Sequence, residues 1–400
     1  MIRDRVFSFL LAGLACVHVR GVAAWEVSGV VAGEARAFFS DPVDPRQYDD
    51  FGLSAYIEPE FYTSWDDGGQ RLVFTPFGRV DQRDGKRTHA DIRELAWSRL
   101  EDDWELRIGF RRVFWGVTEF LHLVDIINQT DLVEDIDGEE KLGQPMVDLA
   151  LMRDWGTLDF FALPYFRERT FPGTEGRLRF ELPIDAGLTQ YESAAKQTHT
   201  DWAARWYQVI GDWEIGLSHF YGTSREPRLM PTFNGQELVL APFYDLIHQT
   251  SLDAQMVYGD WLWKLELLRR EGHGETFFAG TGGFEYTLFG ILDSPADIGL
   301  ITEYAYDGRS ELAPPQPFKN DIVLGLRLAL NDAQSTQILF SYVRDLGEGS
   351  RFFNLEASRR IGDSLKLSLE GRFFVAVDQS NPLYGARDDD YARLELGWYF

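Results

Sequence analysis

Apolar and polar residues alternate along most of the chain. In "DWELRIGFRRVFW", apolar residues occupy every second position from Trp104 to Phe110, and charged residues such as Arg107 lie between them. The segments "WLWKLELLRR" and "SLKLSLEGRFFVAV" repeat the pattern. Side chains of a β-strand alternate between two faces, whereas an amphipathic helix needs apolar residues three and four positions apart. The alternation therefore predicts strands with one apolar and one polar face.

About eighteen segments of this kind follow one another, each roughly ten to thirteen residues long, which is the length of a tilted strand that crosses a bilayer. We expect strands at 26–39, 54–65, 70–81, 88–100, 103–115, 145–153, 156–168, 200–210, 213–223, 250–258, 261–270, 274–289, 296–306, 320–330, 335–344, 351–361, 364–377 and 390–400. Segment 237–247 has strand character too, although Pro242 in its middle argues for a loop.

The lengths of the connections alternate as well. Every second gap is a short turn, such as "DDGG", "EDD" or "GDS". The other gaps include all the long ones, at 40–53, 116–144, 169–199, 224–249, 307–319 and 378–389. A soluble sandwich or propeller would scatter its loop lengths, whereas an outer-membrane barrel has short periplasmic turns and long outer loops. The sequence therefore predicts an all-β fold, a transmembrane antiparallel up-and-down β-barrel of about 16–18 strands.

The two ends of the chain fit an exported barrel. The start, "MIRDRVFSFLLAGLACVHVRGVAAWEV", has a basic head, a short apolar run and a small-residue cleavage site, so we expect residues 1–24 to be a signal peptide for Sec-type export and residues 25–400 to form the barrel. The end, "YARLELGWYF", is a strand with an apolar face. In Trp398 and Phe400 it resembles the terminal strand of Gram-negative outer-membrane proteins. That resemblance implies recognition by the barrel-assembly machinery.

Composition narrows the class of protein. The formal net charge of −25 argues against nucleic acid as a partner, because binding to phosphates depends on basic patches. The single cysteine, Cys16, lies in the expected signal peptide, so the mature chain has neither a disulfide framework nor a cysteine metal site. A content of 14% aromatic residues with a mean hydropathy of −0.25 suits a barrel with a polar inside and an apolar outside.

A barrel of this size is too wide for its own side chains to fill, so transport is the expected role. By alternation, a ladder of basic residues faces the lumen: Arg107, Arg111, Arg205, Lys264, Arg327, Arg360, Arg372 and Arg393. Glutamates, among them Glu105, Glu266 and Glu370, are interleaved with it. Such charges either set the ion preference of a pore or form salt bridges that only solvate the wall, and the sequence leaves both open.

The loop after the fifth strand, 116–144, is unusually acidic and carries Glu119, Asp125, Asp131, Glu134, Asp135, Asp137, Glu139 and Glu140. It also contains an apolar set from Phe120 to Ile127 that an exposed loop should not have. We therefore expect the loop to fold into the lumen as a constriction that favours cations. The alternative is an outward lid whose carboxylates bind divalent ions that bridge lipopolysaccharide.

The same region carries a resemblance to known families. From Arg107 to Leu132 the chain shows a strand, Trp115-Gly116, the acidic Glu119, and then a pattern of Asp125, Asn128 and Asp131. It resembles poorly characterised porin-like outer-membrane families, namely one whose members often accompany membrane exporters and the alginate-export porins. Gln129 stands where those families more often have proline. The resemblance implies a barrel and a pore, without a substrate.

No catalytic set, cofactor motif or metal-ligand spacing emerges from the sequence, so we expect a channel and no enzyme. The first interpretation is an outer-membrane porin that lets small hydrophilic solutes or ions diffuse passively, with membrane lipid and lipopolysaccharide around it. The alternative is a partner-binding or export-associated barrel with little conductance of its own. The oligomeric state stays open, because strands that face lipid and strands that face a neighbouring subunit have similar compositions.

Overall fold

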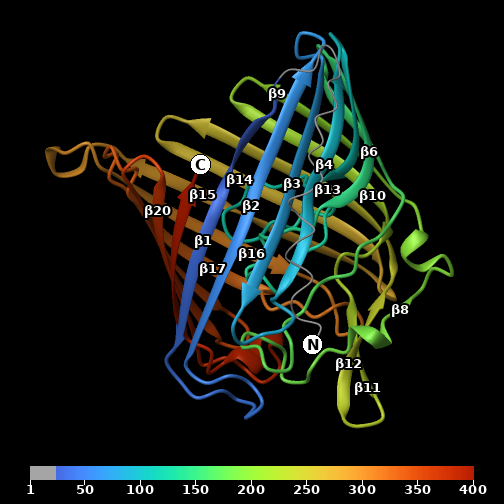
Figure 1. Cartoon of the computed structure of the whole chain (residues 1–400), viewed down its shortest axis with the longest axis vertical. Helices are drawn as coiled ribbons and strands as arrows, with labels where there is room; N and C mark the ends of the chain where they lie inside the picture. The colour runs from blue at the N-terminus through green and yellow to red at the C-terminus, as the bar shows by residue number, and fades with distance from the viewer. Residues whose placement is uncertain (1–23) are drawn as a thin grey trace.

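The computed structural model describes residues 24–400, and the expected signal peptide lies almost entirely outside them. Eighteen strands form one closed antiparallel barrel (Figure 1). They are β1 (Glu26–Phe38), β2 (Phe51–Trp65), β3 (Gln70–Asp81), β4 (His89–Leu100), β5 (Trp104–Arg111), β6 (Gln144–Arg153), β7 (Gly156–Leu163), β9 (Asp201–Ile210), β10 (Trp213–Thr223), β13 (Leu246–Tyr258), β14 (Trp261–Gly272), β15 (Glu275–Leu288), β16 (Asp297–Asp307), β17 (Asn320–Ala329), β18 (Gln337–Asp345), β19 (Arg351–Ile361), β20 (Leu365–Val375) and β21 (Tyr391–Tyr399).

Each barrel strand pairs with its neighbours in chain order, and β1 pairs with β21 to close the barrel. All eighteen expected segments coincide with these strands, and the prediction of an up-and-down barrel is confirmed. The largest differences in bounds are at β5 and β7, which end four and five residues earlier than expected, and at β13, which begins four residues earlier. The alternation of short and long connections is also present. The short turns lie at the end of the barrel where β2 meets β3, and the long loops lie at the other end.

A separate three-stranded sheet lies among the long loops. It consists of β11 (Arg228–Phe233), β12 (Leu238–Tyr244) and the two-residue β8 (Gln190–Tyr191). The ambiguous segment 237–247 is therefore a strand, β12, but one outside the barrel wall, and Pro242 lies within it opposite Leu229. Four short 3₁₀ helices, η1 (Ala186–Leu188), η2 (Lys196–Thr198), η3 (Ile291–Asp293) and η4 (Pro382–Ala386), complete the elements of residues 24–400.

The two faces of the wall differ in polarity. Outward residues such as Val31, Leu217 and Leu265 are apolar and exposed, whereas charged residues such as Glu266 and Arg93 are buried on the inside. On the outside of β14, Trp261 and Trp263 stack with a ring separation of 5.6 Å near the short-turn end. An apolar outer surface with aromatic residues at its edge suits lipid. No helix in residues 24–400 has the length and apolar character that a helical span requires.

The C-terminal residue is held by the first strand. The backbone N–H of Phe400 donates to the carbonyl of Gly29 at 3.1 Å, and the N–H of Gly29 donates back to the carbonyl of Phe400 at 3.1 Å. The rings of Trp398 and Phe400 are 5.2 Å apart. The final aromatic residues thus belong to the seam that closes the barrel, which explains why the chain ends on an apolar strand.

Deleting residues 398–400 should impair closure of the barrel, because β1 loses its partners at one end of the seam. We expect a lower yield of folded protein, measured as the heat-modifiable band on cold electrophoresis after refolding. A Phe233→Ala variant, altered in β11 outside the barrel, serves as the control and should refold normally. Equal yields from the deletion and the control would show that the seam does not need these residues.

Candidate functional site: a charged lumen crossed by one loop

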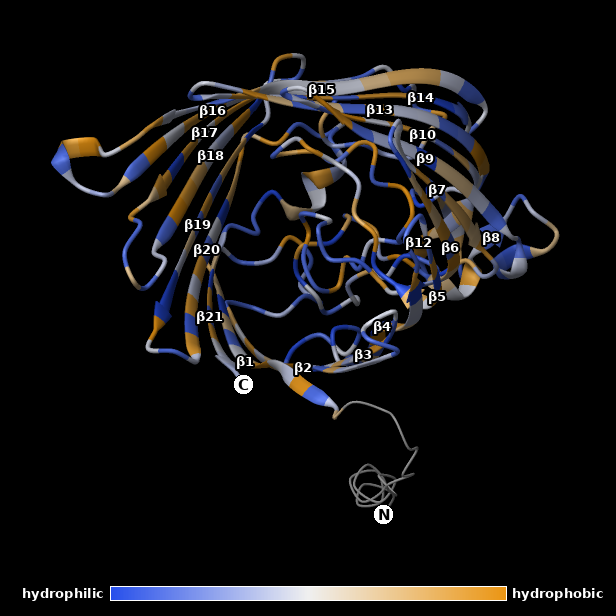
Figure 2. Ribbon diagram, turned by 90° about the horizontal axis from the view of Figure 1, so that it is seen from above, coloured by the Kyte–Doolittle hydropathy of each residue, from blue (hydrophilic) through white to orange (hydrophobic). Residues whose placement is uncertain are grey.

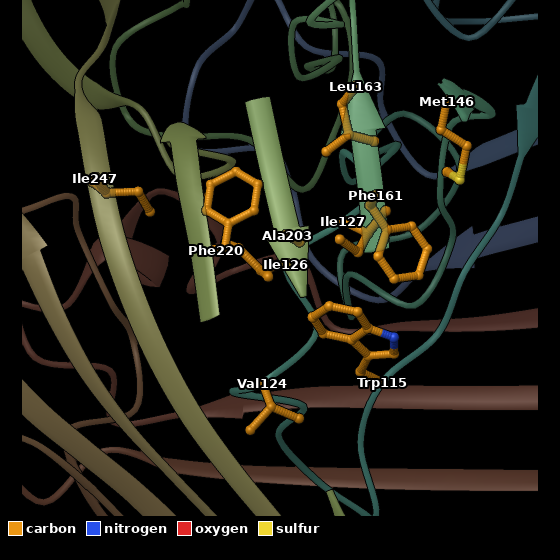
Figure 3. Packing of buried hydrophobic residues seen from close by; sticks show 10 residues of the cluster. All are labelled: Trp115, Val124, Ile126, Ile127, Met146, Phe161, Leu163, Ala203, Phe220 and Ile247. Carbon is orange, nitrogen blue, oxygen red and sulfur yellow. The ribbon is translucent and has the colours of Figure 1, made fainter. Parts of the chain in front are cut away.

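The loop between β5 and β6, residues 112–143, lies inside the barrel; we name it the lumen loop (Figure 2). Its apolar residues Trp115, Val124, Ile126 and Ile127 are buried against the inner wall of β6, β7, β9, β10 and β13 (Figure 3). The ring of Trp115 meets that of Phe161 edge-on at 5.6 Å. The expected packing of the apolar set on the wall is confirmed, and the outward lid is not what the structure shows.

Two carboxylates of the opposite wall hold the backbone of the lumen loop. Glu266 of β14 accepts hydrogen bonds from the N–H groups of Val117 at 2.7 Å and Val124 at 3.1 Å. Glu303 of β16 accepts from the N–H groups of Glu119 at 2.7 Å and Phe120 at 3.0 Å. Hydrogen bonds to an ionised acceptor are stronger than neutral ones, and these carboxylates satisfy loop donors that would otherwise be buried without partners.

Sequence reasoning placed Glu266 on the lumen face but did not identify it as an anchor. Alternation shows which face a residue takes and not what it meets. The one signal of this contact in the sequence was the glycine at position 116. Gly116 has a φ of +149°, and a Cβ added to it would lie 3.1 Å from Oε1 of Glu266.

Arginines of β3 and β4 hold one side of the lumen loop. Glu134 lies 2.7 Å from Arg79 and 2.7 Å from His89. The fully buried Asp131 lies 2.7 Å from Arg93, which is itself almost fully buried. Truncating one member of such a pair leaves a buried charge without compensation, so each pair depends on its partner.

The loop meets β20 and β21 on another side of the barrel. Asp135 lies 2.7 Å from Arg393, and Asp137 lies 2.7 Å from Arg372. Between the two contacts, Ile136 packs in a cluster that includes Val323 and Phe352 of the wall. The lumen loop therefore spans the interior and is fixed to several sides of the barrel.

Most of the expected basic ladder is likewise paired. Arg107 and Arg111 share Asp148, Arg205 pairs with Asp253, Lys264 and Arg327 share Glu119, and Arg372 and Arg393 hold the loop. Arg360 forms no ion pair within residues 24–400. One of the two interpretations of the sequence was that these charges form salt bridges with one another, and the structure shows such an ion pair at seven of the eight positions.

The acidic loop residues are mostly neutralised in the same way. Asp125 pairs with Lys141 of the same loop at 3.1 Å. Glu139 has only His122, at 3.8 Å, as an ionic partner, and Glu140 has none in the described part of the chain. The cation preference expected from an acidic constriction stays a prediction. Because basic side chains pair with the other carboxylates of the loop, such a preference would come chiefly from Glu139 and Glu140.

Two cavities remain beside the lumen loop. The larger, about 650 Å³, lies between the loop and the wall and is lined by charged residues such as Arg327 and Glu356 together with apolar ones such as Phe120. The smaller, about 330 Å³, lies by β5, β6, β7 and β9 and is lined by Arg107, Arg111 and Asp148 among others. Both cavities are bounded by the lumen loop on one side and the inner wall on the other.

One group of residues contains side chains that could bind a metal ion, but two neighbouring arginines make its charge unfavourable for a cation. Potential ligand atoms of His89, Asp131 and Glu134 lie within 4.8 Å of one another. Arg79 and Arg93 already bind the two carboxylates at 2.7 Å each. Guanidinium groups this close oppose a second cation, so the cluster serves to fix the loop.

Comparisons with known proteins support the fold. No family model and no curated protein matches the chain. Among solved structures, OccK11 (OpdR) of Pseudomonas aeruginosa shares 11% identity and a TM-score of 0.54, over 94% of this chain and 95% of that one. A mutant of the Rh. blastica porin shares 10% identity and a TM-score of 0.46, over 94% of this chain and all of that one. The likeness to OccK11 supports the fold of the closed barrel. The exporter-associated and alginate-export families are not confirmed.

Removing the Glu266 anchor should loosen the lumen loop. Glu266→Ala leaves the N–H groups of Val117, Thr118 and Val124 without their acceptor, at a cost of about 1–3 kcal/mol for each buried donor. We expect faster amide hydrogen exchange in this part of the loop, measured by mass spectrometry on the refolded barrel. Glu60→Ala, which removes a wall glutamate that does not contact the loop, is the control. Unchanged exchange in Glu266→Ala would show that the other contacts suffice.

Docking of the loop on β20 and β21 should depend on pH. Burial, together with the charge of Asp135, raises the pKa of Asp137 from 3.8 to about 7. Glu139 and Arg372 also act on this carboxyl, and the attraction of Arg372 is too weak to offset burial. The docked loop binds more protons than a released one between pH 4 and 7, so docking weakens as the pH rises through that window and is constant above it.

The pH dependence can be measured as hydrogen exchange of residues 133–138 or as channel conductance at pH 5 and pH 8. We expect more exchange and more current at pH 8. In Asp137→Asn the difference should disappear, because the titrating group is gone. A difference that persists in Asp137→Asn would assign it to another group.

Proposed function

We propose that the protein is an outer-membrane channel through which small hydrophilic solutes or ions diffuse passively, with the lumen loop as its constriction. The observation that carries this proposal is the closed eighteen-strand barrel, whose charged inner wall surrounds a cavity of about 650 Å³ while its outer surface is apolar. In such a channel, selection depends on the width of the passage and on the charges that line it. No bond chemistry is needed, and we propose no enzymatic activity.

The proposal includes a route to the membrane. A signal peptide at residues 1–24 would direct Sec-type export, and the barrel-assembly machinery would recognise the last strand through Trp398 and Phe400. Around the folded barrel, the partners would be outer-membrane lipid and lipopolysaccharide. The chain ends as a barrel strand paired to β1, which supports this assembly route.

A second candidate is a partner-binding or export-associated barrel with little conductance of its own. The anchoring of the lumen loop favours it, because Glu266, Glu303, Arg93, Arg372 and Arg393 together fix the loop at several sides of the lumen. In this case a partner would have to displace the loop before anything passed.

Conductance of residues 25–400, refolded and inserted in a planar bilayer under a salt gradient, tests both candidates. We expect open channels. Glu134→Gln with Asp135→Asn should raise the current, because the contacts with Arg79 and Arg393 weaken. Glu139→Gln with Glu140→Gln is the matched control for charge: it should lower cation preference without a comparable rise in current.

The outcomes separate the candidates. A well-inserted barrel that stays closed in the wild type, and opens only when Glu134 and Asp135 are neutralised, would replace passive diffusion with the partner-binding role. A cation preference that does not respond to neutralising Glu139 and Glu140 would remove the acidic constriction from the proposal.

A further inference from the structure

Four arginines gather where the outer ends of four strands meet the large cavity. Arg169 follows β7, Arg225 follows β10, Arg270 lies near the end of β14, and Arg309 follows β16. All four line the cavity, as does Glu226. Because the short turns of an outer-membrane barrel face the periplasm, this end of the lumen is the one that an entering solute meets first. We name the four residues the arginine cluster.

Three of these arginines are occupied by carboxylates of the protein. Arg309 lies 2.8 Å from Asp307 and 2.5 Å from Glu226. Arg225 lies 2.7 Å from Asp201. Arg270 lies 3.1 Å from Glu226. Three carboxylates thus pair with three of the four guanidinium groups, and two of the three, Asp201 and Asp307, are not part of the cavity lining.

Arg169 is the member that no carboxylate of the described residues contacts directly, although the charge of Glu226 acts on it from further away. Within the residues described, it forms no ion pair, and its only side-chain hydrogen bond runs from Nε to Oε1 of Gln129 at 3.2 Å. Burial lowers the pKa of Arg169, which is the behaviour of a cation that lacks full compensation. Its guanidinium is therefore available to a ligand in the cavity.

A second, independent observation lies at Arg270. This side chain is only 2% exposed, yet its Nη1 makes no hydrogen bond, although it lies 3.1 Å from a carboxylate oxygen of Glu226. A buried charged donor without a hydrogen-bond partner is costly and uncommon in proteins. The cluster thus has more cationic than anionic groups, and one of its donors is buried without a hydrogen-bond partner.

We propose that the arginine cluster binds the oxyanion group, a carboxylate or a phosphate, of a small solute that enters the lumen from outside, with Arg169 as its main contact. The planar guanidinium presents paired donors that match such groups. Leu123 and Leu268 line the cavity too and form part of an apolar cluster, so the body of the solute meets apolar surface. This inference rests on the proposed channel function and names the class of solute.

Equilibrium binding to refolded residues 25–400 in detergent tests the proposal by calorimetry at low ionic strength. The probes are succinate for a carboxylate, glycerol 3-phosphate for a phosphate, and glycerol as the uncharged control. We expect at least one anion to bind and glycerol not to bind. The anion that binds more tightly identifies the source of the oxyanion.

The variant Arg169→Gln removes the free charge and leaves no carboxylate of the protein unpaired, so it should fold. We expect it to weaken anion binding about tenfold, the loss expected for a charge-assisted contact. Arg360→Gln makes the same change on β19 at a residue outside the cavity lining, and it should alter affinity less than twofold. Absence of binding by both anions, equal binding of glycerol, or equal weakening in the two variants would overturn the proposal.

Two further measurements test the proposal if the variant does not refold and separate anion binding from conductance. If Arg169→Gln does not refold, the wild-type affinity is measured at rising sodium chloride, and an affinity that does not fall overturns the proposal. Binding is also measured without ion flow. A barrel that binds the anion but does not conduct overturns passive diffusion alone, and a barrel that conducts but does not bind overturns the arginine cluster alone.

Discussion

The structure depends on one constraint, which is that every backbone donor and acceptor in lipid must find a partner within the protein. An open sheet would leave two unpaired edges, so β1 and β21 have to meet. Closure places eighteen strands around a space that their own side chains cannot fill. The polar inner wall, the lumen loop and the cavity beside it all follow from that unfilled space.

The lumen loop fills much of the space by two different kinds of contact. Its apolar residues pack on the wall of β6 to β13, while charged groups hold it elsewhere. Burying an ion pair costs desolvation and adds little net stability, but it strongly penalises any arrangement that separates the partners. The charges therefore specify where the loop lies, and the apolar contacts supply most of the free energy that keeps it inside.

The strands were predictable because a membrane wall imposes a period of two on the sequence, and a run such as Trp104 to Phe110 shows it without ambiguity. The placement of the loop was predictable from apolar residues such as Ile126, which had to be buried somewhere. Individual partners were not predictable. Asp137 and Arg372 are 235 residues apart, and only the curvature of the closed barrel brings them together. The same is true of the arginine cluster, whose four members come from four separate parts of the chain.

The small sheet of β8, β11 and β12 extends from the barrel on the long-loop side (Figure 1). The turn between β11 and β12 contains Asn234 and Gly235, and Gly235 has a φ of +95° with open space around it. This hairpin takes no part in closing the barrel or in lining the large cavity. The fold therefore lets the length and sequence of this hairpin vary without a change in the barrel wall or in the cavity.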